Sequence, residues 1–260
     1  MGFEITSRLS VGAINPNIHI NRNRYNTSFG QTLNADKFER QSIDKYTTET
    51  AIRRMIEANP KIKNIVKDFN PEMQLNLEEL KELLQNHASD TQNVASGIIN
   101  NLPFSLKYKV DEKSIDDAAY LHDIGKILIP KEILNKSGKL DDRETKIMHC
   151  HSELGYEMLK TTDINPTTLK LIRNHHQNQK RTGYPWVGND FNADLNLQIL
   201  SVSDKYSALT ENRVYKKALS PKEALTIIYQ DVKEGKIHPL VFKALINYVD
   251  NMSLAKVSQA

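Results

Sequence analysis

LHDIGKILIP, from Leu121 to Pro130, sets a histidine beside an aspartate at the end of an apolar helical face, with a lysine close behind. A second doublet, His175-His176, opens the stretch HHQNQKRTGYP. A buried imidazole or carboxylate is costly unless it is paired, hydrogen-bonded or bound to a metal. The two stretches therefore raise the question of whether the rest of the chain brings matching groups to the same place.

Helical spacing surrounds both stretches. Ile115, Ala118, Ala119 and His122 fall on one face, which we expect Gly125 to end. Helix-start patterns recur along the chain: capping boxes open at Asp141 and Ser220, and prolines follow Asn165 and Ser220 at the first helical position, with a last helix after Pro239. No alternating strand pattern of useful length is visible, so the sequence predicts an all-α protein built as a multi-helix bundle.

Composition divides the chain into three parts. Residues 1–35 carry repeated asparagines and no sustained apolar period, which predicts a disordered, flexible tail. Residues 36–70 read as a helical extension broken at Pro60, and residues 71–255 read as the main domain.

The bulk properties exclude several classes of function. A net charge of +3 is too mild to argue for a nucleic-acid partner. The single cysteine fits a reducing compartment, and no apolar run approaches the roughly 20 residues that span a bilayer. We therefore expect a cytoplasmic protein without stable membrane insertion.

Polar residues interrupt other apolar faces as well. His87, His151 and Asp204 each stand where a core leucine would be expected. Any one of them alone is better explained as a satisfied core residue. Three on separate helices, together with the two doublets, favour a metal site, because adjacent ligands on a helix suit a broad target such as two ions about 3.5–4 Å apart.

The donor types narrow the choice of metal. Imidazole with carboxylate suits two divalent ions, Fe or Mn first and Ni, Co or Zn as alternatives, and the lack of thiolates argues against a closed structural zinc site. An open pair of ions makes hydroxide available near neutral pH and stabilises the oxygens of an in-line attack on phosphorus. Lys126 is placed to carry a positive charge to a phosphate oxygen.

With these motifs the sequence resembles the HD-GYP family of the HD metal-dependent phosphohydrolase superfamily, bacterial signalling phosphodiesterases acting on cyclic di-GMP. The resemblance runs from about His87 to Leu245 and includes HDIGKILIP, HSELGYEML, HH followed by GYP, SVSDKYSAL and NRVYKKALSPKEA, in family order and spacing. It implies an HD-type helical bundle.

The resemblance also implies roles for particular residues. Asp123 would bridge the two metals and, with Lys126, form the catalytic pair. Lys126, Arg213 and Tyr215 would bind substrate phosphate. Gly183, Tyr184 and Pro185 would form the signature loop, which in the family is linked to contacts with a signalling partner. The implied metal ligands are His87, His122, Asp123, His151, His175, His176 and Asp204.

Several positions depart from the family pattern. Where the family usually reads Glu, Arg, Asp and Gly after the histidine doublet, this chain has Gln177, Asn178, Lys180 and Arg181. These changes remove acids that would orient histidines and add positive charge, which puts substrate preference and rate in doubt. Leu83 stands where members with a third metal carry a glutamate, so we expect two metals. His149 is expected to face solvent.

Three functional hypotheses follow. The first is a metal-dependent phosphodiesterase that opens cyclic di-GMP to pGpG, and onward to GMP. The second is an HD phosphohydrolase acting on another cyclic dinucleotide or on a nucleotide. The third is a non-catalytic binding or interaction module on an HD-GYP scaffold.

Overall fold

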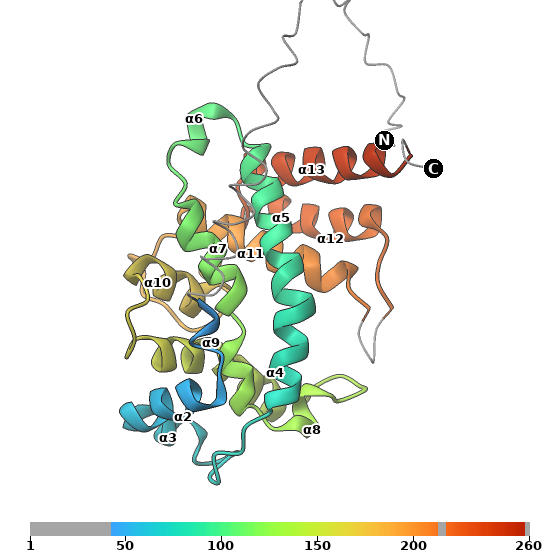
Figure 1. The fold of residues 1–260 in the computed structure, drawn as a ribbon. Coiled ribbons are helices and arrows are strands. Elements are labelled where there is room, and N and C mark those ends of the chain that lie inside the picture. The colour runs from blue at the N-terminus through green and yellow to red at the C-terminus, as the bar shows by residue number, and fades with distance from the viewer. Residues whose placement is uncertain (1–42, 213–216, 258–260) are drawn as a thin grey trace, which may run out of the picture. The chain divides into compact units, whose positions relative to one another are not determined.

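The computed structural model describes residues 43–212 and 217–257, and within these ranges all regular structure is helical (Figure 1). The prediction of an all-α fold is confirmed. The described residues from Lys45 onward belong to one compact unit. The tail predicted over residues 1–35 lies outside the described residues. None of the described helices combines the length and apolar character needed to cross a bilayer.

Helices α2 (Glu49–Ala58) and α3 (Pro60–Val66) are separated at the predicted break. Their starts are capped by the side chains of Thr48 and Asn59. Both helices pack against α9 (Asp142–Leu159) and bury Ile52 and Ile62 completely. Helices α2, α3 and α9 lie in the same compact unit. The predicted domain boundary near residue 70 stays a prediction.

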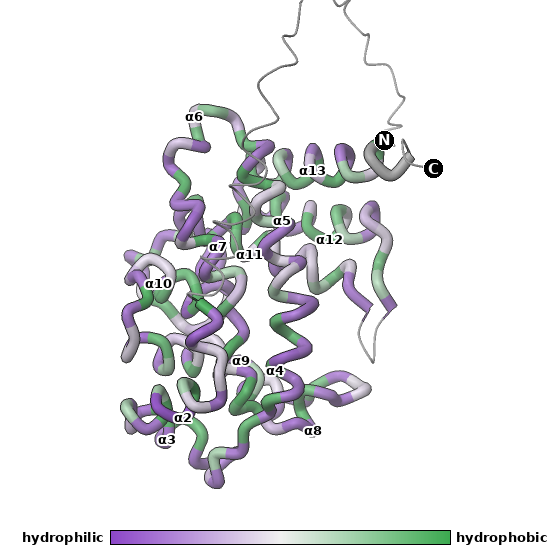
Figure 2. Tube along the Cα trace, in the orientation of Figure 1, coloured by the Kyte–Doolittle hydropathy of each residue, from purple (hydrophilic) through white to green (hydrophobic). Residues whose placement is uncertain are grey.

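The centre of the bundle is formed by α5 (Ser89–Asn100), α7 (Glu112–Leu121), α10 (Pro166–Asn174) and α11 (Leu195–Thr210). Helices α12 (Pro221–Lys233) and α13 (Pro239–Val257) pack on α11, and α13 also packs on α5 (Figure 1). Hydrophobic and hydrophilic residues alternate along these helices (Figure 2), and the apolar ones form a core that includes Ile98, Ile115, Leu121 and Leu200. Burial of apolar surface is the main stabilising term for such a bundle.

The predicted helix starts agree with the structure. Asp141 and Ser220 both form complete capping boxes, and Pro166 and Pro239 begin α10 and α13. These signals lie within one helical turn of the residues they order, so they can be read from the sequence alone.

The segment leading into His87 contains a π-helical turn, η2 (Leu84–Ala88), which joins α4 (Leu77–Leu83) to α5. One local expectation needs correction. Helix α7 ends at Leu121 and not at Gly125, and a 3-10 helix, η3 (Ile124–Leu128), follows it. Gly125 serves a close contact, because a Cβ there would lie 2.0 Å from the carbonyl oxygen of His151. Two short helices, α6 (Phe104–Lys107) and α8 (Lys131–Leu134), complete the described elements.

Candidate metal centre

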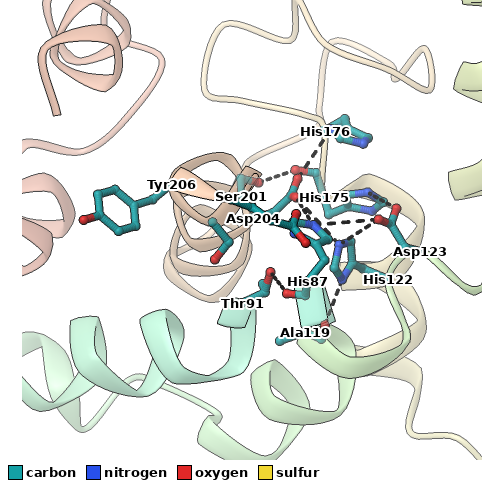
Figure 3. A network of polar contacts seen from close by, with 12 residues as sticks. His87, Thr91, Ala119, His122, Asp123, His175, His176, Ser201, Asp204 and Tyr206 are labelled. Atoms are coloured by element: carbon teal, nitrogen blue, oxygen red, sulfur yellow. Dashed lines mark hydrogen bonds and ion pairs between the residues drawn. The ribbon is translucent and has the colours of Figure 1, made fainter. Parts of the chain in front are cut away.

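The structure brings all of the predicted ligands into one largely buried cluster. Figure 3 shows this cluster without a label on His151. The ligands come from five different segments. The π-helical turn η2 supplies the first histidine, the residues directly after α7 and α10 supply the two doublets, and α9 and α11 supply one ligand each. They are His87, His122, Asp123, His151, His175, His176 and Asp204.

One group of ligand atoms gathers around Asp204. Its Oδ1 lies 3.0 Å from His87 Nε2 and 3.7 Å from His122 Nε2. All ligand atoms of this group lie within 4.8 Å of one another. The spacing suits a single ion held by two imidazoles and a carboxylate.

A second group contains only imidazoles. His151 Nε2 lies 3.2 Å from His175 Nε2 and 3.2 Å from His176 Nε2. Asp123 stands between the two groups: its Oδ1 is 3.3 Å from His151 Nε2, while its Oδ2 is 3.4 Å from His122 Nε2. One carboxylate oxygen therefore faces each group.

The backbone sets the orientation of three of these rings. The Nδ1 atoms of His122, His151 and His175 lie 2.7–2.8 Å from the carbonyl oxygens three residues earlier in the chain. A carbonyl can only accept, so Nδ1 carries a proton in each of these rings, and in a neutral ring Nε2 then presents its lone pair to the cluster. Ring orientation thus does not depend on the acids that this sequence lacks after the histidine doublet.

The donor set fits divalent ions. In the neutral rings of His151 and His175, the Nε2 lone pairs face each other at 3.2 Å, which is repulsive without a cation beside them. Two nitrogens about 2.0–2.1 Å from one ion and at right angles would be about 3 Å apart. The buried atoms His122 Nε2 and Asp123 Oδ1 also have no hydrogen-bond partner.

The electrostatics of the cluster favour positive charge. Burial alone would raise the pKa of Asp123, but Lys126 and His122 outweigh it and hold the pKa well below its usual range. Burial likewise opposes charging of His122, yet Asp123 and Asp204 raise its pKa to about 10. Burial lowers the pKa of His151 to about 3 and that of His175 to about 4. A metal competes with protons for these ligands. The neutral imidazoles of His151 and His175 and the ionised Asp123 are in the state that binds a metal, whereas binding at His122 would displace a proton.

Lys126 lies at the edge of the cluster. Its Nζ is 2.6 Å from Asp123 Oδ2, and its side chain keeps 16% of its surface exposed. The other residues expected to contact substrate, Arg213 and Tyr215, lie outside the described residues.

Glu211 is a neighbour that the sequence analysis missed. Its Oε2 lies 3.4 Å from His87 Nδ1, on the side of the ring opposite Asp204. Glu211 is the C-cap residue directly after α11 and has an extended backbone, so helical spacing from Asp204 does not place it.

The signature loop lies directly on the cluster. A Cβ on Gly183 would be 1.9 Å from the carbonyl oxygen of His176, so only a glycine allows this approach. The Tyr184 ring lies 4.4 Å from the His176 ring and 6.0 Å from the His151 ring, and it stacks on His149 at 3.6 Å between ring centroids. The expectation that His149 faces solvent is therefore wrong: its half-buried ring packs on the loop.

Comparison with known proteins identifies the family of the chain. The sequence pattern of the family described as "HD domain" matches residues 72–241. The chain belongs to the HD domain family. The expected HD-GYP assignment is confirmed by this match together with curated relatives that are cyclic di-GMP phosphodiesterases.

Two curated relatives illustrate the range. A cyclic di-GMP phosphodiesterase of Pseudomonas aeruginosa is 34% identical over 133 residues, which cover 51% of this chain and 32% of that protein. A 3'3'-cGAMP-specific phosphodiesterase of Vibrio cholerae serotype O1 is 30% identical over 135 residues, covering 52% of this chain and 31% of that protein. The chain thus spans about a third of the length of these relatives.

A solved structure shares the fold. An HDG"Y"P protein from Bdellovibrio bacteriovorus superposes with a TM-score of 0.50 at 14% identity, covering 82% of this chain and 68% of that chain.

Proposed function

We propose that this HD domain protein is a metal-dependent phosphodiesterase that hydrolyses cyclic di-GMP to pGpG, and onward to GMP. The observation that carries the proposal is the placement of Asp123, with one carboxylate oxygen facing each of two groups of buried ligands. The cyclic di-GMP phosphodiesterase activity of the Pseudomonas aeruginosa relative supports the choice of substrate.

The chain's own residues would hold two divalent ions, Fe or Mn in the first place. His151, His175 and His176 would bind one ion, while His87, His122 and Asp204 would bind the other. Asp123 would touch both. When bound, the ions supply a hydroxide near neutral pH and stabilise charge on the phosphate oxygens.

Lys126 and the signature loop would shape the substrate side. Lys126 holds Asp123 ionised and keeps part of its surface exposed, so its ammonium can meet a phosphate oxygen. Arg213 and Tyr215 would line the opposite side of the phosphate pocket. Trp186, directly after Pro185, is 86% exposed and supports contact of this loop with a signalling partner. We further propose residues 71–255 as the catalytic domain and residues 36–70 as its extension.

A second candidate substrate is a different cyclic dinucleotide. The Vibrio cholerae relative is specific for 3'3'-cGAMP. Gln177, Lys180 and Arg181 change the polarity of the segment beside the cluster, and this favours a shift in base or phosphate preference.

The test is a direct comparison of substrates. Protein purified without oxygen and loaded with Fe or Mn is assayed with cyclic di-GMP, 3'3'-cGAMP, cyclic di-AMP and a nucleotide monoester. We expect cyclic di-GMP to be opened fastest, and we expect elemental analysis to find two ions per chain. Hydrolysis of another substrate with cyclic di-GMP left intact would refute the substrate assignment, and binding without turnover would indicate an interaction module.

His176→Ala provides the matched loss of function. It removes one ligand of the imidazole group and should abolish hydrolysis while the helical circular dichroism spectrum is kept. His238→Ala, which changes a histidine outside the cluster, is the control and should retain activity.

A further inference from the structure

A buried side-chain amide forms hydrogen bonds with the backbone of the signature loop. Gln177 is 2% exposed, and its Nε2 donates to the carbonyl oxygen of Pro185 at 2.5 Å. Its Oε1 accepts the backbone N–H of Gly183 at 3.2 Å. The two contacts hold the backbone on both sides of Tyr184.

These partners determine what the side chain at position 177 must be. The Gly183 N–H can only donate, and the Pro185 carbonyl can only accept. A single side chain that joins them needs one acceptor and one donor, and an amide has both. A glutamate, the usual residue of the HD-GYP pattern here, could accept from Gly183 but would place a second carboxylate oxygen against the Pro185 carbonyl.

An aromatic contact also holds the signature loop. The His149 ring lies parallel to the Tyr184 ring, with an interplanar angle of 11° and ring centroids 3.6 Å apart. On its other side the Tyr184 ring lies 4.4 Å from His176, at 31°. Tyr184 is thus enclosed between a half-buried histidine of α9 and a candidate metal ligand.

We propose that Gln177 and His149 are positioning residues that together clamp Tyr184 against His176. Gln177 holds the loop because its amide donates one hydrogen bond and accepts another. The glutamine at this position therefore has a structural role of its own that a glutamate could not fill. The effect on catalysis rests on the proposed phosphodiesterase function, but the clamp itself can be measured without any substrate.

Hydrogen exchange and fluorescence test the Gln177 side of the clamp. Gln177→Met keeps the size of the side chain and loses both contacts, while Gln177→Glu keeps only the acceptor. We expect the Gly183 amide to exchange about tenfold faster in Gln177→Met, the equivalent of one lost hydrogen bond of typical strength. Trp186, the single tryptophan, adjoins Pro185, so its fluorescence anisotropy should fall in both variants.

The matched control adds the same charge elsewhere. Gln74→Glu changes an exposed glutamine in the connection between α3 and α4, and should leave both readouts at the wild-type value. If Trp186 anisotropy in Gln177→Glu stays at the wild-type value, or Gly183 exchange in Gln177→Met does, the proposed role of the amide is wrong.

Substitutions at His149 test the stacking contact with Tyr184, including a rescue by another flat ring. His149→Ala removes the ring and should lower Trp186 anisotropy, whereas His149→Phe restores a flat ring and should return it to the wild-type value. Equal anisotropy in the alanine and phenylalanine variants would overturn the stacking role. This pair also decides the proposal if the Gln177 variants fail to fold.

Activity gives the last comparison. In metal-loaded protein, Gln177→Glu and His149→Ala should lose about 10-fold to 100-fold in kcat, the usual effect of removing support around a metal ligand. If the wild type hydrolyses no phosphodiester while the loop readouts change as expected, the proposed function fails and the clamp stands. If activity falls but the loop readouts do not change, the clamp fails and the function stands.

Discussion

At the scale of single residues, three of the five histidines of the cluster are oriented by main-chain groups. His122, His151 and His175 each direct Nδ1 to a carbonyl of their own helical turn, at 2.7–2.8 Å. Such a contact depends on backbone conformation and not on the identity of a distant acid. The altered residues after the doublet therefore leave the orientation of these three rings intact.

Gly125→Ala should disrupt the cluster through the backbone. The added Cβ would lie 2.0 Å from the carbonyl oxygen of His151 and 2.6 Å from the Gly155 nitrogen, and neither backbone atom can move without shifting α9. We expect a loss of about 1–3 kcal/mol in the free energy of unfolding, as for other overpacked sites, together with weaker metal retention. Urea unfolding and elemental analysis measure the two effects.

Gly138→Ala is the control for this substitution. A Cβ on Gly138 would have no neighbour within 4 Å, so stability and metal content should stay at wild-type values. Equal metal content in the two alanine variants would contradict the role given to Gly125.

Glu157 should make stability depend on acid pH. Its carboxylate, 1% exposed, lies 2.7 Å from Lys61 Nζ and 2.5 Å from Lys160 Nζ. Burial raises its pKa, but these contacts outweigh burial and lower the pKa to about 2. Because the folded-state pKa lies below the unfolded value of about 4.3, the stabilisation is complete above the unfolded value and is lost as pH falls toward the folded one.

The measurement compares the wild type with Glu157→Gln in urea from pH 7 to pH 3. We expect the variant to be less stable by about 1–3 kcal/mol at pH 7, with the difference narrowing below about pH 4.5. Glu82→Gln, at an exposed position, should show little difference at any pH. A Glu157→Gln difference that stays constant across the range would refute this account.

At the scale of elements, the site depends on irregular turns inserted between regular helices. The π-helical turn η2 carries His87, and the 3-10 helix η3 follows the His122-Asp123 pair directly. π-Helical turns are rare and are frequently found at functional sites. Here the turn holds His87 between Asp204 on one side and Glu211 on the other.

At the contact between α5 and α13, we predict that the effect of one substitution on stability changes sign with the residue it faces. A Cβ on Gly97 would lie 2.2 Å from the Tyr248 ring, so Gly97→Ala should destabilise the protein. In a Tyr248→Ala background the ring is gone, and the same substitution should stabilise it by up to about 1 kcal/mol, because alanine is the better helix former. Thermal unfolding of the four proteins of this cycle measures both effects, and the same sign in both backgrounds would contradict the packing argument.

At the scale of the whole molecule, the cluster ties together segments that are distant in sequence. His87 and Asp204 are separated by 117 positions and lie 3.0 Å apart. Ions bound here would hold η2, α9, α11 and the ends of α7 and α10 to one point. Metal content should therefore govern global stability as well as activity.

Chelation should lower the melting temperature. At a free ion concentration of 100 times the dissociation constant, binding stabilises the folded state by about 2.7 kcal/mol, or roughly 5–10 °C for a domain of this size. Differential scanning fluorimetry with and without a chelator measures the shift. Asp123→Asn weakens the contact of this carboxylate with both ligand groups, so the chelator should shift its melting temperature much less. A melting temperature unaffected by chelator in the wild type would argue against bound ions.

The sequence by itself determined the helix starts and the inventory of ligands. Helix starts at Asp141, Asn165 and Ser220 follow from contacts within one turn, so they could be predicted without tertiary structure. The ligand types were visible because polar residues interrupted apolar helical faces, and the ordered motifs identified the family.

Only the tertiary structure decided how these parts meet. The facing of Asp123 toward both ligand groups, the approach of Glu211 to His87 and the stacking of His149 on Tyr184 all join different elements of the bundle. Helical spacing places a side chain on a face but says nothing of what packs against that face. Such contacts arise from the packing of whole helices, which is why His149 was expected in solvent and was found against the loop.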